Sequence, residues 1–422
     1  MSHITNFAEA RTVLLESVPA AGSQPINYKL DRMRQLMAAL GNPQNELKII
    51  HVAGTSGKTS TCYYIAACLQ AAGQKVGLTI SPHVDEVNER VQINLVPLAE
   101  KTFCSQLEAF LKLVSKTKLQ PTYFELLVAF AFYVFKQQRV DYAVVEVGLG
   151  GLFDGTNIID DPGKVCVITD IGFDHTDILG NTLAAIATQK AGIIGPHNPV
   201  FSYLQEAEVR QVIEDTCQAK DADLHSLTMP ALDDLPMSLP LFQRRNWYLA
   251  EQVSRFVLTR DQITLPPQAE WLAAADTLVP ARMEINQLAN KTLIIDAAHN
   301  SQKMQTLVTS LKDRFPGQAM AVLIALVDGK SLDTASILRE LLPIADSLIV
   351  TSFGTIQDMP RHSIDPYQVA AEAQKLGIPN VEVIQKPEQA FSELKQQPAD
   401  CLLVTGSFYL LNHVRPHMLE TA

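Results

Sequence analysis

Short apolar runs that alternate with longer helix-like stretches are the feature that most limits the folds open to this chain. The runs in its first two-thirds include LKIIHV, QKVGLTIS, DYAVVEVG and KVCVITDIG, and KTSTCYYIAACLQAAG and FELLVAFAFYVFKQQ lie between them. Val- and Ile-rich runs without polar alternation are typical of strands buried on both faces of a sheet. The first part of the chain is therefore predicted to be a parallel sheet wrapped by helices.

A second alternation begins near Lys291 and predicts a second, smaller α/β domain. Its strand-like runs are TLIID, AVLIALVD, DSLIVTS, VEVIQ and CLLVTGS. A chain of 422 residues is long enough for two domains. We predict a first domain over 1–288 and a Rossmann-like second domain over 289–422, with the ligand site in the cleft between them.

Composition and charge exclude several classes of protein. The formal net charge of −11 and the pI near 5.4 argue against a general nucleic-acid binder. No apolar run approaches the roughly 20 residues that span a bilayer, and the first residues do not resemble a secretory signal. The six cysteines are scattered without a CxxC pair, which favours reduced thiols. We expect a cytoplasmic protein, monomeric, that binds small molecules and neither nucleic acid nor membrane.

Two glycine-containing turns follow predicted strands, and the first has the features of a phosphate-binding loop. The strict GxxxxGK[ST] pattern fails because its first glycine position holds Val52. Free backbone N–H groups at a helix start and the charge of Lys58 nevertheless favour phosphate. The loop residues that we expect to bind it are Gly54, Thr55, Ser56, Gly57, Lys58, Thr59 and Ser60. An ordinary turn before a helix is the alternative.

The second glycine turn, GLGG at 148–151, does not indicate a dinucleotide site. Its spacing approaches GxGxxG, but the last glycine position holds Phe153 and no helix-like pattern follows directly. A dehydrogenase is therefore disfavoured.

Besides the glycine turns, further short motifs are spread along most of the chain. They are IHVAGTSGKTST, ISPHVDEVNERVQI, YFELLVAFAF, VEVGLGGLFDGTN, ITDIGFDHTDILG, QKAGII, QRRN, ARME, DAAHN and VTGSFYL. In this order they resemble the folylpolyglutamate synthase/dihydrofolate synthase family of the Mur ligase superfamily. The resemblance implies a P-loop-type, parallel-sheet ATP-binding domain with a pterin or folate pocket, followed by a Rossmann-like glutamate ligase domain.

The resemblance also implies a magnesium site. Glu146 ends a predicted strand and His175 is expected to end the next, and a hydroxyl, a carboxylate and an imidazole suit a hard cation. The family implies Ser81, Glu146 and His175 as the Mg²⁺ ligands. It further implies that Lys190, in QKAGII, is carbamylated and binds a second Mg²⁺. A surface lysine with a buried stem is the alternative for Lys190, and a hydrogen-bonded histidine is the alternative for His175.

Other motif positions are implied to bind nucleotide or glutamate. Asn246, Arg282 and Asp296 match residues that hold ATP, whereas Arg244 and Arg245 are interpreted equally well as solvated charges.

His299 is expected near phosphate or the incoming glutamate, and we take it as the candidate base. Ser407 starts the last predicted helix, whose dipole suits a glutamate carboxylate, although helix capping explains a serine there equally well.

The chain departs from the family pattern at several positions. Ser56 replaces a usual Asn and Thr59 a usual Gly in the loop. Leu152 replaces a usual Arg and Gly155 a usual Ala in the segment of the pterin pocket, where Phe124 and Asp154 are implied to bind the acceptor substrate, near Glu125. Ser301 replaces a Pro after DAAHN. The missing Arg leaves open how dihydropteroate is held, but it does not affect ATP use.

The implied reaction is ATP-dependent amide formation through an acyl phosphate. The acceptor is dihydropteroate, the γ-carboxyl of a glutamylated tetrahydrofolate, or both, and the amine is that of L-glutamate. Lys58 and Mg²⁺ would spread the charge that develops on the γ-phosphoryl group. Two alternatives stay open: a Mur-type amino-acid ligase acting on another carboxylate, and a non-catalytic nucleotide-binding switch.

Overall fold

The computed structural model describes residues 4–18, 30–231, 234–329, 333–356 and 360–421. The chain divides into two compact units, which are described separately. The first comprises residues 1–239 and 243–277, and the second comprises residues 240–242 and 278–422. The division after Thr277 precedes the predicted boundary at 288/289, because residues 284–288 pair with a strand of the second unit.

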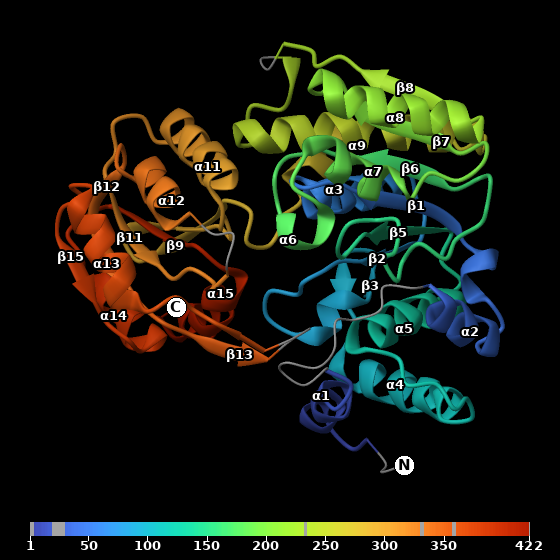
Figure 1. The fold of residues 1–422 in the computed structure, drawn as a ribbon, viewed down its shortest axis with the longest axis horizontal. Coiled ribbons are helices and arrows are strands. Elements are labelled where there is room, and N and C mark those ends of the chain that lie inside the picture. Colours follow the sequence, from blue (N-terminus) through green and yellow to red (C-terminus); the bar gives the residue numbers. More distant parts are fainter. Residues whose placement is uncertain (1–3, 19–29, 232–233, 330–332, 357–359, 422) are drawn as a thin grey trace. The chain divides into compact units, whose positions relative to one another are not determined.

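The first unit contains an eight-stranded sheet that is mostly parallel (Figure 1). In sheet order its strands are β4 (Val96–Pro97), β3 (Gln92–Ile93), β2 (Val76–Thr79), β5 (Tyr142–Glu146), β1 (Lys48–Ala53), β6 (Val165–Ile168), β7 (Pro199–Tyr203) and β8 (Asp223–Leu227). The strands from β2 to β8 in this order are parallel, and β3 and β4 add an antiparallel edge.

Helices cover both faces of this sheet. They are α1 (Phe7–Leu15), α2 (Asp31–Ala39), α3 (Lys58–Ala71), α4 (Glu100–Val114), α5 (Tyr123–Gln138), α6 (Thr176–Leu179), α7 (Leu183–Ala191), α8 (Ala207–Lys220), α9 (Leu241–Arg260) and α10 (Gln268–Ala273). Short 3₁₀ turns lie at Pro43–Glu46, Val87–Arg90 and Ala274–Asp276.

The buried core explains why the strands lack polar alternation. Ile49 and Ala143 pack in one apolar cluster with α5, and Ala53 and Ile168 pack in another with α7 and α8. The register pairs Ile49 with Ala143 and Ala53 with Ile168, so the side chains of each pair share one face of the sheet. The central strands are buried from both sides, as their composition predicts.

The second unit contains a six-stranded sheet. In sheet order its strands are β15 (Val381–Val383), β12 (Ala345–Val350), β11 (Met320–Ile324), β16 (Cys401–Thr405), β10 (Lys291–Ile295) and β9 (Glu284–Leu288). The five strands expected from the sequence are present, and β9 is an additional antiparallel edge strand paired with β10. Its burial alternates along the strand, which is why no continuous apolar run marks it.

The helices of the second unit are α11 (Ser301–Arg314), α12 (Thr334–Leu341), α13 (Pro366–Lys375), α14 (Pro387–Gln396) and α15 (Phe408–Val414), followed by a 3₁₀ segment, Arg415–Thr421. The helices from α11 to α13 pack around a separate apolar core that includes Ile294, Leu307, Val322 and Leu403. Strands β13 (Gly354–Ile356) and β14 (Pro360–His362) pair antiparallel in a separate two-stranded sheet. The prediction of two α/β units with mainly parallel sheets, the larger first, is confirmed.

The proline-rich segment after β8 is only partly irregular. The sequence predicts irregular or edge structure over 227–246; Leu227 belongs to the edge strand β8, as expected, but residues 241–246 form the first turns of α9. The QRRN motif therefore lies on a helix. Within the described ranges, no helix is both long and apolar enough to cross a membrane.

Candidate functional site

The turn between β1 and α3 has the geometry of a phosphate-binding loop. Gly54 and Gly57 adopt φ values of 150° and 89°, which other residues rarely adopt. A Cβ atom on Gly54 would lie 1.8 Å from Thr169 Oγ1, and one on Gly57 would lie 2.4 Å from Asn246 Oδ1. Both glycines are therefore required by their backbone conformation and by the side chains packed against them.

Asp170 holds the loop through its backbone. Its carbonyl oxygen accepts hydrogen bonds from the backbone N–H groups of Thr55, at 2.8 Å, and Ser56, at 3.2 Å. The Thr55 hydroxyl also donates to the carbonyl of Gly172 at 3.0 Å. These contacts fix the first half of the loop to the chain that follows β6.

Arg245 in turn anchors Asp170. Its Nη2 lies 2.6 Å from Asp170 Oδ1, and its guanidinium carbon lies 4.4 Å from the centroid of the Tyr203 ring. Burial raises the pKa of Asp170, and the Arg245 charge opposes that shift. Arg244 is buried as well, and its Nε donates to the carbonyl of Leu239 at 3.0 Å. The interpretation as a solvated charge is therefore wrong for Arg244, whereas Arg245 pairs with Asp170 and its side chain stays 36% exposed.

Two lysines converge on one carbonyl of the loop. Lys58 Nζ donates to Gly54 O at 3.0 Å and lies 3.4 Å from Thr55 O. Lys190, near the end of α7, donates its Nζ to the same Gly54 O at 2.8 Å. Lys190 is 4% exposed, so the alternative of a surface lysine is wrong.

Several hydroxyl groups line the start of α3. Thr59 Oγ1 donates to Glu146 Oε1 at 2.9 Å. Within the part of the chain that the structure describes, the buried hydroxyl oxygens of Ser56 and Ser60 have no hydrogen-bond partner. Buried polar atoms without a partner are costly, so a loop with two of them is suited to a polar ligand.

Glu146 and Ser81 lie together, as the predicted metal site requires. Glu146 ends β5, is 3% exposed, and accepts a hydrogen bond from the Ser81 backbone N–H at 3.2 Å. The Ser81 hydroxyl oxygen is buried, and among the described residues it has no partner. A carboxylate beside an unpartnered buried hydroxyl is a donor set that Mg²⁺ accepts.

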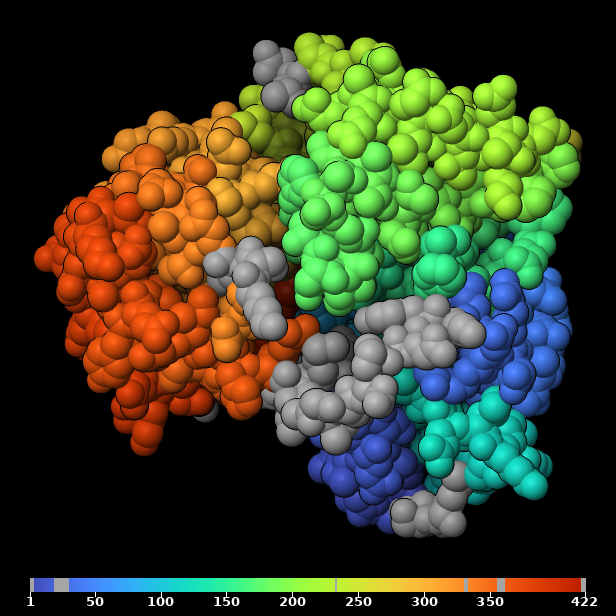
Figure 2. Space-filling view, in the orientation of Figure 1, coloured from blue at the N-terminus to red at the C-terminus, as the bar shows by residue number. Residues whose placement is uncertain are grey.

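His175 is placed differently from the prediction that it ends a strand. Strand β6 ends at Ile168, and His175 follows in a surface segment, where it precedes α6 with φ of 50°. Figure 2 shows this segment as bright green spheres on the surface, and Phe173 and Ile178 within it are 56% and 46% exposed. The described residues contain no group of three or more His, Cys, Asp or Glu side chains that could hold a metal. The predicted set has only two such residues.

Phe124 and Asp154 meet at Gly148, directly after β5. A Cβ on Gly148 would lie 2.5 Å from Phe124 Cζ and 3.2 Å from Asp154 Oδ2, so both side chains contact this glycine. Asp154 is buried, and its Oδ2 accepts a hydrogen bond from the Leu149 backbone N–H at 2.8 Å. Burial raises the pKa of Asp154, and its hydrogen bonds oppose that shift. The residues predicted to bind the acceptor are thus neighbours.

Leu152 and Gly155, the two departures from the family pattern in this segment, make ordinary packing and backbone contacts. A Cβ on Gly155 would lie 3.4 Å from the Phe124 ring and 3.7 Å from Glu125 Cγ, which are ordinary contacts. The Leu152 backbone N–H donates to Gln189 O at 2.7 Å, and its side chain lies against Gly192. Leu152 thus packs on the end of α7.

The second unit brings together Asp296 and Arg282. Asp296 follows β10, and its two oxygens accept hydrogen bonds from the backbone N–H groups of Met283, at 2.7 Å, and Ala298, at 2.8 Å. Burial raises the pKa of Asp296 to about 6, and the Arg282 charge opposes that shift. The guanidinium of Arg282 lies 4.6 Å from the centroid of the Phe408 ring.

His299 lies beside this pair. Its Nδ1 is 2.8 Å from Ala297 O, and its Nε2 is 3.0 Å from Lys303 Nζ. Because Lys303 is a donor, Nε2 accepts and the proton of the neutral ring lies on Nδ1. The lone pair of Nε2 faces the Lys303 ammonium, and the role predicted for His299 as a base stays a prediction.

Residues at the helix starts of this unit act as caps. Asn300 caps α11, in which Ser301 is the first residue, and its Oδ1 accepts from the Lys303 backbone N–H at 2.9 Å. Ser407 caps α15, and its Oγ accepts from the Tyr409 backbone N–H at 3.0 Å. The capping alternative for Ser407 is therefore correct, while its role toward glutamate stays a prediction.

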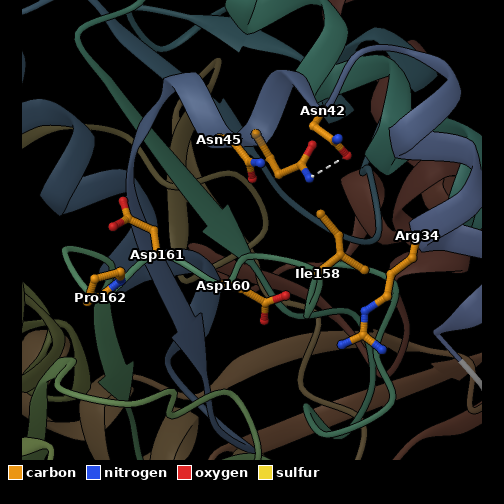
Figure 3. A pocket seen from close by; sticks show the side chains of 8 residues that line it. Arg34, Asn42, Asn45, Ile158, Asp160, Asp161 and Pro162 are labelled. Carbon is orange, nitrogen blue, oxygen red and sulfur yellow. Dashed lines mark hydrogen bonds between the residues drawn. The ribbon is translucent and has the colours of Figure 1, made fainter.

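A pocket of about 460 Å³ lies elsewhere in the first unit (Figure 3). The segments that line it precede β1 and β6, whereas the loop at Gly57 follows β1. Its lining residues are Arg34, Asn42, Gln44, Asn45, Ile158, Asp160, Asp161 and Pro162. It therefore opens at the opposite end of the strands from the phosphate-binding loop, and it includes none of the predicted site residues.

The sequence analysis did not identify two residues that support the loop although they lie far from it in the sequence. Thr169 and Asp170 are the clearest cases, since they contact the loop at Gly54, Thr55 and Ser56. Both residues belong to the motif ITDIGFDHTD, from which only His175 was selected as a site residue, so their membership of that motif could have indicated them.

The family models match both units. The model described as "Mur ligase middle domain" matches residues 52–226, and the model described as "Mur ligase, glutamate ligase domain" matches residues 281–408. The dihydrofolate synthase/folylpolyglutamate synthase of Bacillus subtilis is 30% identical over 92% of this chain and 94% of its own. The chain belongs to the folylpolyglutamate synthase/dihydrofolate synthase family of Mur ligases.

Other relatives and solved structures agree with this membership. The dihydrofolate synthetase of Saccharomyces cerevisiae is 33% identical over 82% of this chain and 86% of its own. The Mycobacterium tuberculosis folylpolyglutamate synthase complexed with ADP and AMPPCP has a TM-score of 0.84 at 26% identity, covering 99% of both chains. Escherichia coli FolC in complex with DHPP and ADP has a TM-score of 0.81 at 26% identity, covering 100% of this chain and 99% of its own. The prediction of an ATP-dependent ligase is confirmed.

Proposed function

We propose that this chain joins L-glutamate to a pteroate-type carboxylate with ATP as the energy source. The acceptor is dihydropteroate, the γ-carboxyl of a glutamylated tetrahydrofolate, or both. The observation that carries the proposal is the loop at 54–60, whose glycines are enclosed by Thr169 and Asn246 and whose buried Ser56 and Ser60 hydroxyls suit a polar ligand. Relatives named for both activities support the choice of substrates.

In the first step a carboxylate oxygen of the acceptor attacks the γ-phosphorus of ATP, forming an acyl phosphate and releasing ADP. The chain's contribution is to hold phosphate oxygens on the backbone N–H groups at the start of α3 and to supply positive charge from Lys58. Lys58 already lies at this loop, where it donates to Gly54 O. A ligand phosphate would replace that carbonyl as its acceptor.

In the second step the neutral amine of glutamate attacks the acyl carbon, an amide bond forms, and phosphate leaves with the electron pair of the broken C–O bond. The attacking nitrogen must lose a proton. His299 Nε2 is the candidate acceptor, because it already acts as a hydrogen-bond acceptor toward Lys303 at 3.0 Å.

The residues around Glu146 fit a magnesium ion. Glu146, the buried Ser81 hydroxyl and His175 would hold it. When bound, Mg²⁺ would neutralise charge on the phosphate oxygens. Thr59 keeps the Glu146 carboxylate in place through its 2.9 Å hydrogen bond, so Thr59 acts by orienting a ligand of the metal.

Lys190 is proposed to carry a carbamate that would bind a second Mg²⁺. Its buried Nζ, which donates to Gly54 O, places it at the loop. Intact mass after chemical trapping in bicarbonate should show an added carboxyl group on Lys190, and an unmodified lysine under these conditions would refute the carbamate.

The function is tested by phosphate release and product formation with ATP, L-glutamate and a panel of acceptors. Lys58→Ala should abolish ligation without unfolding the chain, whereas Lys101→Ala, an exposed lysine on α4, should leave ligation unchanged. Wild-type activity on uridine-linked precursors alone would establish the alternative Mur-type ligase. ATP binding without ligation of any acceptor would establish the nucleotide-binding switch.

We also propose that the enzyme acts as a monomer in the cytoplasm. The six cysteines are buried and unbridged, which suits a reducing compartment. Light scattering of the purified protein tests the monomer, and localisation of a tagged full-length chain tests the compartment.

A further inference from the structure

A buried chain of hydrogen bonds links the middle of β1 to Asp154. His51 Nε2 lies 2.8 Å from Thr156 Oγ1, and Thr156 Oγ1 lies 2.5 Å from Asp154 Oδ1. The exposed fractions of His51 and Thr156 are 0%, and that of Asp154 is 5%. His51 and Thr156 are 105 positions apart in the sequence, so only the folded protein brings these hydrogen-bond partners together.

The number of protons determines the direction of these bonds. Asp154 accepts backbone hydrogen bonds from Leu149, Thr156 and Gly148, so it is best satisfied as a carboxylate. The single hydroxyl proton of Thr156 then points to Asp154, and Thr156 Oγ1 must accept from His51. His51 is therefore protonated on Nε2.

The other ring nitrogen of His51 agrees with this assignment. His51 Nδ1 is buried, and within the described part of the chain it has no hydrogen-bond partner. A bare lone pair is less costly to bury than an N–H group. Burial, together with the nearby charge of Lys164, lowers the pKa of His51 well below its ordinary value, so the ring is neutral.

The position of His51 is unusual for a central parallel strand. Its register partners on the neighbouring strands are Val145 and Cys166, both fully buried. An apolar side chain would fill this place at lower cost than a desolvated imidazole. The contact that the imidazole gains is the hydrogen bond to Thr156.

The far end of this hydrogen-bond chain lies at Gly148, where the residues predicted to bind the acceptor meet. Asp154 Oδ2 lies beside Gly148, and Phe124 contacts the same glycine. This oxygen accepts a backbone hydrogen bond from Leu149, and a backbone hydrogen bond from Gly148 also stabilises the carboxylate.

We propose that His51 and Thr156 are positioning residues for the acceptor substrate. They hold the Asp154 carboxylate in one orientation, in which Oδ2 accepts a hydrogen bond from an N–H group of a nitrogen heterocycle such as a pterin ring. Phe124 provides the apolar wall of the same pocket. This proposal rests on the proposed function, because it assumes that the acceptor carries such a ring.

The first test uses Thr156→Val, which keeps the shape of the side chain and removes its hydroxyl, and Thr156→Ser as the matched control. Thr156→Val should raise the KM for dihydropteroate about tenfold to a hundredfold, the range expected for a hydrogen bond to a charged group, and leave the KM for ATP unchanged. Thr156→Ser should stay near wild type. His51→Leu and His51→Gln form a second pair, since the glutamine amide can still donate a hydrogen bond.

The second test reads the proton directly. Nitrogen-15 NMR of the histidine rings, with His51 assigned from the spectrum of His51→Gln, should show the proton on Nε2 in wild type. Thr156→Val should remove the signature of a hydrogen-bonded Nε2–H. A proton on Nδ1 in wild type would overturn the proposal, because the chain of donors would then run the other way.

The kinetic outcomes separate this proposal from the function on which it rests. If wild type ligates dihydropteroate and Thr156→Val has the same acceptor KM as wild type, the positioning role is overturned but the proposed function is not. Equal rises in the KM for ATP and for dihydropteroate also overturn it, because they would indicate a general structural defect. A wild-type enzyme that ligates no pteroate overturns the proposed function itself.

Discussion

Replacing Gly57 by alanine tests how the loop is built, because two separable costs meet at this glycine. The first is the backbone conformation, with φ of 89°. The second is the space for a Cβ, which would lie 2.4 Å from Asn246 Oδ1 and 3.2 Å from its Cγ. Gly73, at the other end of α3, has a similar φ of 76° but nothing within 4 Å of its Cβ position. Gly73→Ala therefore measures the backbone cost alone.

The expected magnitudes follow from this comparison. Gly73→Ala should lower the free energy of unfolding by about 1–2 kcal/mol, the cost of a left-handed backbone for a residue with a Cβ. Gly57→Ala should cost about 2–5 kcal/mol, because displacing Asn246 adds about 1–3 kcal/mol to the same backbone term. It should also weaken ATP binding at least tenfold, whereas Gly73→Ala should leave ATP binding unchanged.

Tryptophan fluorescence during urea unfolding is a suitable assay. The chain has two tryptophans, Trp247 and Trp271, and both are buried in the first unit, so their signal reports the unit that contains the loop. In the Asn246→Ala background, which lacks the side-chain amide that a Cβ on Gly57 would meet, Gly57→Ala should cost no more than Gly73→Ala. Equal costs of the two glycine variants in the wild-type background would refute the reasoning.

Three further outcomes follow from the structure. Gly155→Ala should change the free energy of unfolding by less than about 1 kcal/mol, because its Cβ meets only ordinary contacts; a larger loss in urea titration would contradict the described packing. Arg245→Met should raise the KM for ATP about tenfold with little change in the acceptor KM, because Asp170, whose backbone holds the loop, loses its ion-pair partner. A KM for ATP equal to that of wild type in steady-state kinetics would exclude this role. The pKa of Asp296, raised to about 6, means that native protein keeps a proton that unfolded protein releases near pH 4. The contribution of Asp296 to the free energy of unfolding, followed by far-ultraviolet circular dichroism, should therefore fall by about 2 kcal/mol as pH rises from 4 to 6, and Asp296→Asn should remove that contribution.

Much of the architecture was readable from the sequence because it depends on local patterns. Continuous apolar runs predicted the central strands, and a glycine turn between a strand and a helix predicted the loop at 54–60. The edge strands β8 and β9 escaped prediction for a physical reason. Each is partly exposed, so neither needs the continuous apolar composition that identifies a central strand.

The candidate site was predictable as a set of residues but not as an arrangement. The motifs named Lys58, Lys190, Asn246 and Asp154, yet composition and spacing do not state that Lys58 and Lys190 share one carbonyl. His175 shows the reverse case, because the motif identified the residue while its expected place at a strand end was wrong.

The sequence by itself determined two α/β units, a glycine-containing loop between a strand and a helix, and the family of ligases to which the chain belongs, since these follow from periodicity and from motifs that lie within short segments. Only the tertiary structure decided that Asn246 encloses Gly57, that Arg245 anchors Asp170, and that His51 reaches Asp154 through Thr156. Those contacts join residues far apart in the chain, and their energies depend on burial and distance, which exist only once the strands and helices have packed.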